Sequence, residues 1–466
     1  MSSASPPSPS ADVPVERIPR QIWVLVIAAF SIAIGFGIVA PVLPQYAASF
    51  SVSITATTVV VSAFAAFRLL WAQPAGALVT RLGERPTYMT GVLVVAASSA
   101  ATAFAQNYWQ LLVFRSLGGI GSVMFTVSAM GLLVRLAPPT IRGRVSALYG
   151  SMFLMGSIVG PVIGGLLGQF GMRVPFLVYA GTLLVAALFI GAMLEVPPRR
   201  SQGDGPGGGA EVLTLREAWS DKAFRSVLGS GFANGWSNFG VRIALVPLFA
   251  AVVISPEPWI AGAVLALFAI GNASVLPVSS RVADTVGRRP LIIGGLLVNG
   301  AFTASLGLAT TTWVLLALSL LAGAGAGLMN PGQQAAVADI IGNDRSAGQV
   351  LSTFQMVQDV GAILGPIIAG LVADAVGYEA AFAVTGVLVM ATAVPWFSTR
   401  ETLERAQISP RIPRLRDARV ITWLAVAVLA GCAALVAPAL WDGAHGPERL
   451  AFSGLYSADA FASFAK

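Results

Sequence analysis

The sequence predicts an all-α membrane protein made of two pseudo-symmetric six-helix halves and one extra C-terminal helix. Apolar residues make up 56% of the 466 residues and charged residues 11%, whereas soluble domains contain about 25% charged residues. Long apolar runs recur along the chain, and motifs of its first half return in the second half at a nearly constant offset. Composition, length of the runs and internal repetition therefore all point to the same fold class.

Each apolar run is long enough to cross a bilayer, which takes about 20 helical residues. A thirteenth run, near 420–441, has the length and the near absence of charge of a further span. If it spans, residues 442–466 end outside the cell; if it lies along the interface, they stay inside. The other twelve runs lie near residues 21–43, 54–79, 88–105, 109–134, 145–169, 174–194, 225–254, 259–280, 290–310, 312–336, 347–373 and 379–397.

Glycine and proline inside the fifth run reveal the duplication. In an ordinary helix interior these residues cost about 1 and 3 kcal/mol, but in lipid small residues let neighbouring helices approach closely. The segment Gly156–Gly165 returns as Gly361–Gly370, 205 positions later, and the loop Gly76–Arg85 returns as Ser280–Arg289, 204 positions later. Two copies of one six-helix unit explain this regularity.

The polar segments divide the chain. The first residues are rich in Ser and Pro and lack the apolar core of a secretory signal, which predicts a disordered tail. A Gly-rich stretch, 203–209, marks a flexible linker between the halves. The predicted organisation is a cytoplasmic tail at 1–19, a first half at 20–195, a cytoplasmic linker at 196–222, a second half at 223–398, a basic linker at 399–419, the extra helix at 420–441 and a tail at 442–466.

The net charge of +7 is explained by topology. With the N-terminus in the cytoplasm, Arg173 is the one basic residue on the short outer loops, as the positive-inside rule requires. Anionic lipids would attract the basic side as a secondary effect, and no nucleic-acid partner is expected. Many Ala, Gly, Val and Arg residues with almost no Lys suggest a GC-rich bacterial genome, hence a multi-pass protein of the bacterial inner membrane.

Sites for cofactors are not evident. A single cysteine, Cys432, rules out an intramolecular disulfide, and a single histidine, His445, rules out a histidine-based metal site. The segment Gly203–Gly209 lacks the strand and the Lys-Ser/Thr of a phosphate loop. No cofactor or metal is expected, an enzyme is the least favoured class, and an ion gradient is the expected source of energy.

Four motifs make residues 20–400 resemble the major facilitator superfamily, and within it the twelve-helix drug:proton antiporters. The segment 156–165 matches the antiporter motif G-x-x-x-G-P-x-x-G-G, and the end of the first helix, 35–44, is similar to an exporter motif. Arg115 precedes a glycine pair, as in the family's fourth helix. The loop 76–85 is similar to G-x-L-a-D-R-x-G-R-K, with departures at Thr80 and Glu84. The resemblance implies the fold and export by antiport, and says little about substrate.

The motif residues have a gating and a structural interpretation. The turns after the second and eighth helices resemble a latch that holds the cytoplasmic side closed, but tight turns need glycine and inner loops need positive charge in any case. Thr80 weakens the first copy and Asp284 keeps the second intact. In the fifth helix, close packing and a bend that biases the cycle toward antiport are both expected. The candidate gating residues are Gly76, Arg81, Gly83, Arg85, Asp284, Gly287, Arg288, Gly156, Gly160, Pro161, Gly164 and Gly165.

Asp359 is the candidate proton-coupling group because it is the one carboxylate predicted near the bilayer centre, where an ionisable residue is costly. If Gly361 and Gly365 pack against a neighbouring helix, Asp359 faces the other way, into a polar cavity, with Gln355 one turn earlier on its side. As a proton carrier it must gain and lose charge during the cycle; as a structural group it would pair permanently with an arginine. We favour the proton role, because three arginines, Arg68, Arg115 and Arg242, outnumber this acid. The same surplus favours neutral or anionic substrates over cationic ones.

Further polar residues extend the candidate site. Arg115 has two possible roles: it caps backbone carbonyls, or it relays the proton. Its place in the family motif implies the relay, and the sequence does not decide between the two. Asn234, Asn238 and Arg242 recur every four residues and are expected to face a central cavity. The candidate substrate contacts are Asn234, Asn238, Arg242, Asn330, Gln334, Gln355 and Arg68.

The predicted function is proton-coupled export of small amphipathic or hydrophobic compounds, such as drugs, by alternating access. The expected partners are the small-molecule substrate, protons and membrane lipids, and the chain is expected to act as a monomer. One alternative is export of a lipid or a specific metabolite by the same fold. An alternative of another class is a non-transporting membrane receptor or scaffold, against which the retained Pro, Gly and buried charges argue.

Overall fold

The computed structural model describes residues 18–137, 142–194, 211–212, 215–341, 345–346 and 348–403. The predicted extra helix at 420–441, the basic linker after residue 403, the C-terminal tail and residues 1–17 of the N-terminal tail lie outside the described residues. Most of the linker between the halves does so as well.

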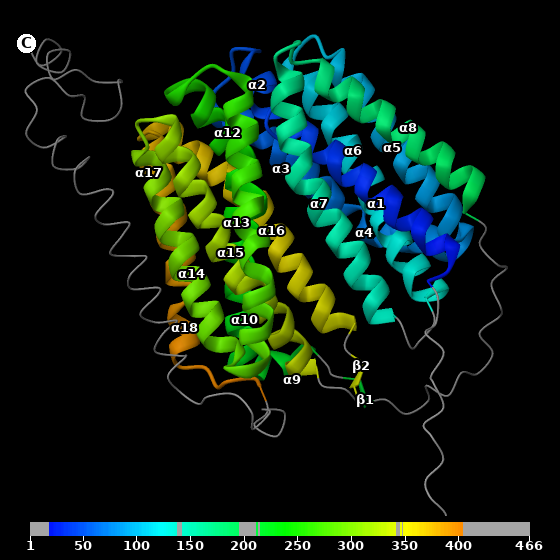
Figure 1. Cartoon of the computed structure of the whole chain (residues 1–466), viewed down its shortest axis with the longest axis vertical. Helices are drawn as coiled ribbons and strands as arrows, with labels where there is room; N and C mark the ends of the chain where they lie inside the picture. Colours follow the sequence, from blue (N-terminus) through cyan, green and yellow to red (C-terminus); the bar gives the residue numbers. More distant parts are fainter. Residues whose placement is uncertain are drawn as a thin grey trace, which may run out of the picture.

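Helices make up both halves of the described chain (Figure 1). The first half contains α1 (Arg20–Val39), α2 (Leu43–Ala48), α3 (Ile54–Leu70), α4 (Ala72–Leu82), α5 (Glu84–Ala103), α6 (Tyr108–Leu136), α7 (Arg142–Gly168) and α8 (Val174–Met193). The second half contains α10 (Lys222–Asn234), η2 (Gly235–Val241), α11 (Arg242–Ala244), α12 (Val246–Phe249), η3 (Ala250–Ile254), α13 (Pro258–Thr285), α14 (Arg288–Ser305), η4 (Leu306–Leu308), α15 (Thr312–Ile341), α16 (Gly348–Ala375), α17 (Tyr378–Ala391) and α18 (Val394–Phe397).

A short helix and two strands lie between the halves in sequence. The strand β1 (Glu211–Val212) pairs in parallel with β2 (Arg345–Ser346), which precedes α16. The helix α9 (Leu215–Ser220) follows β1 and packs against α10 and α16. The linker strand is therefore joined to the second half, at the end of the bundle opposite α2 (Figure 1).

Within the described residues, ten helical stretches are long and apolar enough to cross a membrane, or eleven if the bent pair α3 and α4 is one span. The helix α5 has twenty residues but is not among them; it carries the buried polar side chains of Ser98, Ser99 and Thr102. All twelve predicted runs before residue 398 coincide with helical segments, which confirms an all-α membrane protein.

Two predicted straight helices are interrupted. The second run bends by 47° between α3 and α4. The seventh run changes from α-helix to π-helix over η2 and again over η3. π-helical turns insert an extra residue per turn and are frequent at functional sites, and η2 carries part of the predicted polar stripe.

The two halves repeat the same helix crossings. A Cβ atom on Gly91 of α5 would lie 2.7 Å from the carbonyl oxygen of Gly121 in α6. Gly295 of α14, 204 positions later, would meet the carbonyl oxygen of Gly325 in α15 at the same 2.7 Å. Conserving these small residues at matching positions keeps both helix pairs in close contact, as expected for a duplicated unit in lipid.

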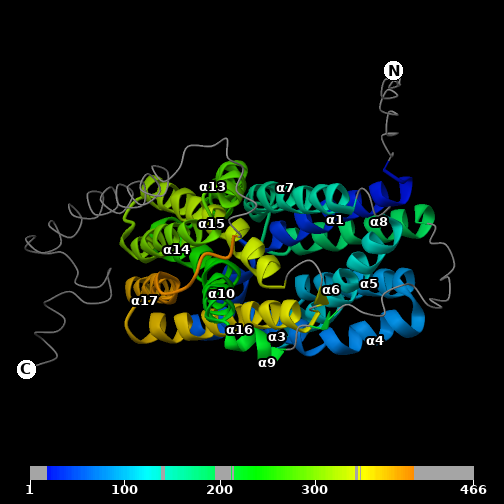
Figure 2. The ribbon, with the colours of Figure 1, turned by 90° about the horizontal axis from the view of Figure 1, so that it is seen from below.

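The halves meet along two seams. The helix α7 packs against α13, and α3 packs against α16, so each half contributes two helices (Figure 2). Gly165 and Gly168 at the end of α7 contact Pro258 at the start of α13, and Gly370 near the end of α16 contacts Thr55 at the start of α3. Both seams therefore have contacts at the end of the bundle that carries α2, and α7 diverges from α13 toward the opposite end (Figure 1).

Candidate transport site

Asp359 lies near the middle of α16, one of the seam helices, and its side chain is half-buried. Nε2 of Gln355 donates a hydrogen bond of 3.3 Å to its Oδ1, so the two residues share a face as predicted. Gly361 and Gly365 contact Trp236 on η2, which confirms that the glycines pack against a neighbouring helix. The carboxyl is thus kept on the side of α16 that does not contact η2.

The arginines do not clamp Asp359. Arg68 of α3 is the cation whose charge acts on Asp359, yet no ion pair within 4.0 Å joins Asp359 to any residue that the structure describes. The guanidinium of Arg115 lies 4.8 Å from the ring centroid of Phe64, and that of Arg242 lies 3.9 Å from that of Phe268. Two of the three arginines stack on rings instead, so in this conformation no arginine that the structure describes forms an ion pair with Asp359.

The two rings on which the arginines stack occupy related positions. Phe64 and Phe268 are 204 positions apart, and each packs on a glycine of the neighbouring helix, Gly119 and Gly323. Arg115 reaches its ring from α6, whereas Arg242 reaches its ring from α11. Cation–π contact compensates part of the cost of burying a charge. Nε of Arg115 nevertheless has no hydrogen-bond partner in the part of the chain that the structure describes.

Asn238 and Arg242 of the predicted stripe form hydrogen bonds with a helix of their own half, and the expectation that the stripe faces a central cavity stays a prediction. Asn234 and Arg242 are buried, and Asn238 is half-buried. Asn238 accepts a hydrogen bond from Asn299 of α14, and Arg242 donates one of 3.1 Å to Thr303 of the same helix. Asn238 lies on the π-helical segment η2, between Asn234 of α10 and Arg242 of α11.

The other candidate contacts are separated from this stripe. Asn330 of α15 is half-buried and Gln334 is exposed, whereas the unpredicted Gln333 on the same helix is buried, and its Nε2 has no hydrogen-bond partner among the described residues. Gln355 is exposed beside Asp359. The structure therefore groups Arg68, Gln355 and Asp359 at the seam of α3 and α16, and places the helix η2 residues in a second group.

The gating turns are held within their own halves. Gly83 and Gly287 have φ values of +91° and +132°, a region that favours glycine. Arg85 donates to the carbonyl oxygen of Gly191 at 2.7 Å, in the first half, and Arg81 is exposed. Gly76 has open space where a Cβ would lie. The contacts in this conformation do not test the latch. It stays a prediction for a conformation in which the cytoplasmic end of the bundle is closed.

The second turn is surrounded by charge. Arg288 forms ion pairs with Asp284 at 3.5 Å and with Asp339 at 3.0 Å, and its backbone N–H donates to Glu401 at 2.8 Å. Sequence reasoning missed Glu401, which also accepts from the backbone of Arg289. Asp284, Arg288 and Asp339 belong to the second half and Glu401 directly follows it in sequence, so the turn is fixed to the end of its own bundle.

The glycines of the fifth run serve two different contacts. Gly156, Gly160 and Gly164 face α1: a Cβ on Gly160 would lie 2.6 Å from the carbonyl oxygen of Ile34. Gly165 faces the other half, where a Cβ would lie 3.0 Å from Cα of Trp259. Pro161 sits inside α7. The motif therefore both packs α7 within its half and lets it approach α13 across the seam.

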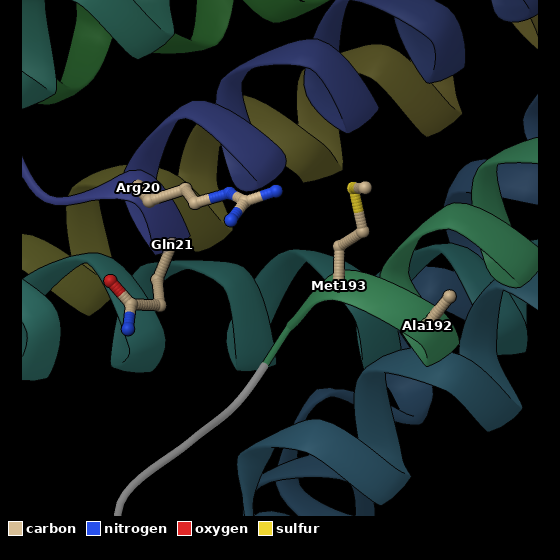
Figure 3. A pocket seen from close by; sticks show the side chains of 4 residues that line it. All are labelled: Arg20, Gln21, Ala192 and Met193. Carbon is tan, nitrogen blue, oxygen red and sulfur yellow. The ribbon is translucent and has the colours of Figure 1, made fainter.

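A pocket of about 190 Å³ lies away from the seams (Figure 3). It is lined by Arg20 and Gln21 at the start of α1 and by Ala192 and Met193 at the end of α8. Both helices belong to the first half, so this pocket is not part of the group around Asp359.

Comparison with known proteins assigns the family. The model of the Major Facilitator Superfamily matches residues 25–255 and 227–464. The chain belongs to the Major Facilitator Superfamily. As a member of this superfamily, it is a multi-pass membrane transporter and not an enzyme.

Individual relatives cover nearly the same region. The Multidrug resistance protein MdtG of Citrobacter koseri is 26% identical over 416 residues, which are 85% of this chain and 98% of that protein. The Quinolone resistance protein NorA of Staphylococcus aureus is 25% identical over 356 residues, 76% of this chain and 90% of the relative.

Solved structures of the superfamily share the fold. A bacterial homologue of the human lysosomal transporter Spinster, in an inward-facing and occupied conformation, superposes with a TM-score of 0.68 at 17% identity, covering 84% of this chain and 98% of the other. A POT family transporter in complex with 5-aminolevulinic acid gives a TM-score of 0.66 at 12% identity, covering 82% and 96%.

Proposed function

We propose that this superfamily member exports small amphipathic or hydrophobic compounds, drugs among them, in exchange for protons by alternating access. The names of the relatives, a multidrug and a quinolone resistance protein, support drug export. We further propose that it works as a monomer in the bacterial inner membrane with its N-terminus in the cytoplasm, as the distribution of basic residues predicts.

The position of Asp359 is the observation that carries the proposal. Its half-buried carboxyl lies at mid-helix on α16, beside the seam with α3, with a neutral partner in Gln355. Moving an ionised carboxylate through an apolar environment is costly, and binding a proton removes that cost. Protonation of Asp359 would therefore permit α3 and α16 to move against each other. Release of the proton would then hold the halves in the conformation that this movement has produced.

The arrangement of the halves fits an exporter that is ready to load. The seams are closed at the α2 end, and α7 diverges from α13 toward the end that carries β1 and β2 (Figure 1). With the N-terminus in the cytoplasm, the diverging end faces the cytoplasm. Rocking of one half against the other would then close this end and open the α2 end.

Proteoliposomes with an imposed pH gradient test the proposal. The native protein should accumulate a fluorescent drug against its gradient, and dissipating the pH gradient with an ionophore should stop it. The variant Asp359→Asn should lower gradient-driven transport to the rate of empty vesicles, because asparagine cannot exchange a proton. Glu257→Gln, which removes an exposed carboxylate in the turn before α13, is the matched control and should leave transport unchanged.

The outcomes separate the alternatives. Proton-driven transport that persists in Asp359→Asn removes this residue from the coupling mechanism. Movement of a fluorescent phospholipid, but of no drug in a panel of neutral, anionic and cationic compounds, would favour the lipid exporter. Absence of transport for every compound, by a protein that folds and binds ligand, would favour a receptor.

A further inference from the structure

The helices α3 and α16 run antiparallel across one seam, and two hydrogen bonds between them show their register. Thr55, at the start of α3, donates its backbone N–H to Oδ2 of Asp374, at the end of α16, at 2.8 Å. Ser62, about two turns further along α3, donates its hydroxyl to the carbonyl oxygen of Ile363 in α16, also at 2.8 Å. The partner on α16 thus moves back in sequence as the partner on α3 moves forward.

The same register brings Arg68 of α3 opposite Asp359 of α16. Arg68 follows Ser62 by six residues and Asp359 precedes Ile363 by four, so each lies about one to two turns beyond that hydrogen bond. The charge of Arg68 acts on Asp359, although no ion pair within 4.0 Å joins these two described side chains. The two groups therefore face each other across the seam without being closed into a contact.

On α16, the face that carries Asp359 changes from buried to accessible at this level. Gln355, Ala362 and Ala369 follow one another at seven-residue spacing, hence on one face. Ala362 and Ala369 are buried, whereas Gln355 is exposed and Asp359 beside it is half-buried. A second stripe of α16 stays exposed over its whole length and is the face expected toward lipid: Val360, Leu364, Ile368 and Leu371. Asp359 is thus accessible from between the halves and not on the lipid stripe.

On α3, the same change occurs at Arg68. Val60 and Phe64 are buried, and Arg68, one turn after Phe64, is half-buried. Phe67 and Trp71, on either side of Arg68, are exposed, and α4 then bends away by 47°. Arg68 and Asp359 therefore lie where the closed part of the seam ends, and both can be reached by a compound that enters between the halves.

These two residues leave the accessible end of the seam without net charge when Asp359 is ionised. Arg115 and Arg242, the other two arginines near mid-helix, stack on phenylalanine rings, and Gln355 is neutral. A cation that approached Asp359 would compete with Arg68 for the carboxylate. An anion would be repelled by the carboxylate itself. Such charge interactions are stronger at a partly buried site than in bulk water.

We propose that Arg68 determines the charge selectivity of transport: as the counter-ion of Asp359, it makes the loading site electrically neutral and restricts the exported compounds to uncharged ones. This inference rests on the proposed exchange for protons and names the class of compound. In that exchange the compound loads after Asp359 has released its proton, when the site contains one negative and one positive charge. An uncharged amphipathic compound needs no counter-charge there.

Binding in detergent and transport in proteoliposomes test this in the full-length protein. Chloramphenicol is uncharged, and ethidium is a permanent cation. The native protein should exchange chloramphenicol, but not ethidium, for protons. Arg68→Gln should lower the Kd for ethidium by about tenfold and allow its transport, because the carboxylate of Asp359 can then pair with it. The Kd for chloramphenicol should stay unchanged.

Three further variants show whether the charge of Arg68 is responsible. Arg68→Lys keeps this charge and should behave as the native protein. Arg281→Gln, which removes an exposed positive charge near the end of α13, is the matched control and should bind ethidium no more tightly than the native protein. In Arg68→Gln combined with Asp359→Asn, the gain for ethidium should disappear, because no carboxylate remains to pair with it.

Proton-driven transport of ethidium by the native protein would overturn the inference, and this measurement needs no variant to fold. An unchanged affinity of Arg68→Gln for ethidium would also overturn it, as would a gain that persists in the double variant. If the native protein transports no compound in a pH gradient, the proposed function itself is contradicted, and ethidium binding in detergent still decides the role of Arg68.

Discussion

The carboxylate of Asp374, at the end of α16, caps the first turn of α3 in the opposite half through Thr55. Oδ2 accepts from the backbone N–H of Thr55 at 2.8 Å and from its hydroxyl at 2.5 Å, and Oδ1 accepts from the N–H of Ile54 at 2.9 Å. The other seam needs no such acceptor: α13 begins at Pro258, which has no N–H, and Gly168 packs directly on its ring. A charged cap on one seam and a proline contact on the other thus hold the α2 end closed.

Removing this cap should favour the conformation that is open at the α2 end. Asp374→Ala leaves the first N–H groups of α3 without their acceptor, at a cost of about 1–2 kcal/mol, which shifts a two-state population by a factor of about 5 to 30. Spin labels on cysteines at Gln106 and Thr310, both exposed at the α2 end, in a Cys432→Ser background, should show a larger share of long distances. Asp374→Asn, which keeps one acceptor oxygen, should have a smaller effect. An unchanged distance distribution in Asp374→Ala means that the cap does not hold this seam.

The second prediction concerns an ion pair that occurs in both halves with the acidic and the basic residue exchanged. Glu84 pairs with Arg135 at 2.8 Å, and 204 positions later Arg288 pairs with Asp339 at 3.0 Å. Glu84→Arg should lower stability by about 2 kcal/mol, because two partly buried positive charges then face each other. Glu84→Arg with Arg135→Asp copies the second half and should recover most of that loss, as measured by thermal unfolding in detergent.

The double variant should recover only part of the lost stability, because position 84 lacks the acidic cap that position 288 has. Arg288 starts a helix whose backbone N–H groups are capped by Glu401, and a cation is unfavourable at a helix N-terminus without such an acid. If the double variant is no more stable than Glu84→Arg alone, the two residues do not stabilise the protein as a pair.

The third prediction compares two glycines of the family motifs. In Gly160→Ala the new methyl group would lie 2.6 Å from the carbonyl oxygen of Ile34 and 2.7 Å from Cα of Gly37, so α1 and α7 must separate. Such overpacking costs about 1–3 kcal/mol. Gly76→Ala places the same methyl group in open space and should leave stability unchanged or raise it slightly. Equal unfolding temperatures for the two variants would contradict close packing of α1 and α7.

Much of the fold could be predicted from the sequence because its signals are local or repeated. Runs of apolar residues predict the spans, a constant offset predicts the two halves, and glycines at four-residue spacing predict the packed faces of α7 and α16. Gly83 and Gly287 were predicted as turn residues, and both adopt positive φ. The mid-helix position of Asp359 and its partner Gln355 also follow from helical spacing.

Tertiary structure decided which partners these elements meet. Helical spacing grouped Asn234, Asn238 and Arg242, but the placement of α14 determines that Asn238 and Arg242 bond to Asn299 and Thr303. The offset of 204 that reveals the duplication also aligns Asn299 with Val95. This alignment could have shown from the sequence that the second half has an amide where the first half has an apolar residue.

What the sequence by itself determined is what must lie in the membrane, where the chain turns, and which helix faces are small enough to pack. Only the tertiary structure decided that Asp374 reaches Thr55 across 319 residues of sequence, that Asp359 has no ion pair among the described residues, and that Asn299 bonds to Asn238 of the stripe. The physical reason is that hydropathy and spacing depend on each helix alone, whereas a hydrogen bond across a seam depends on how two rigid halves are placed against each other.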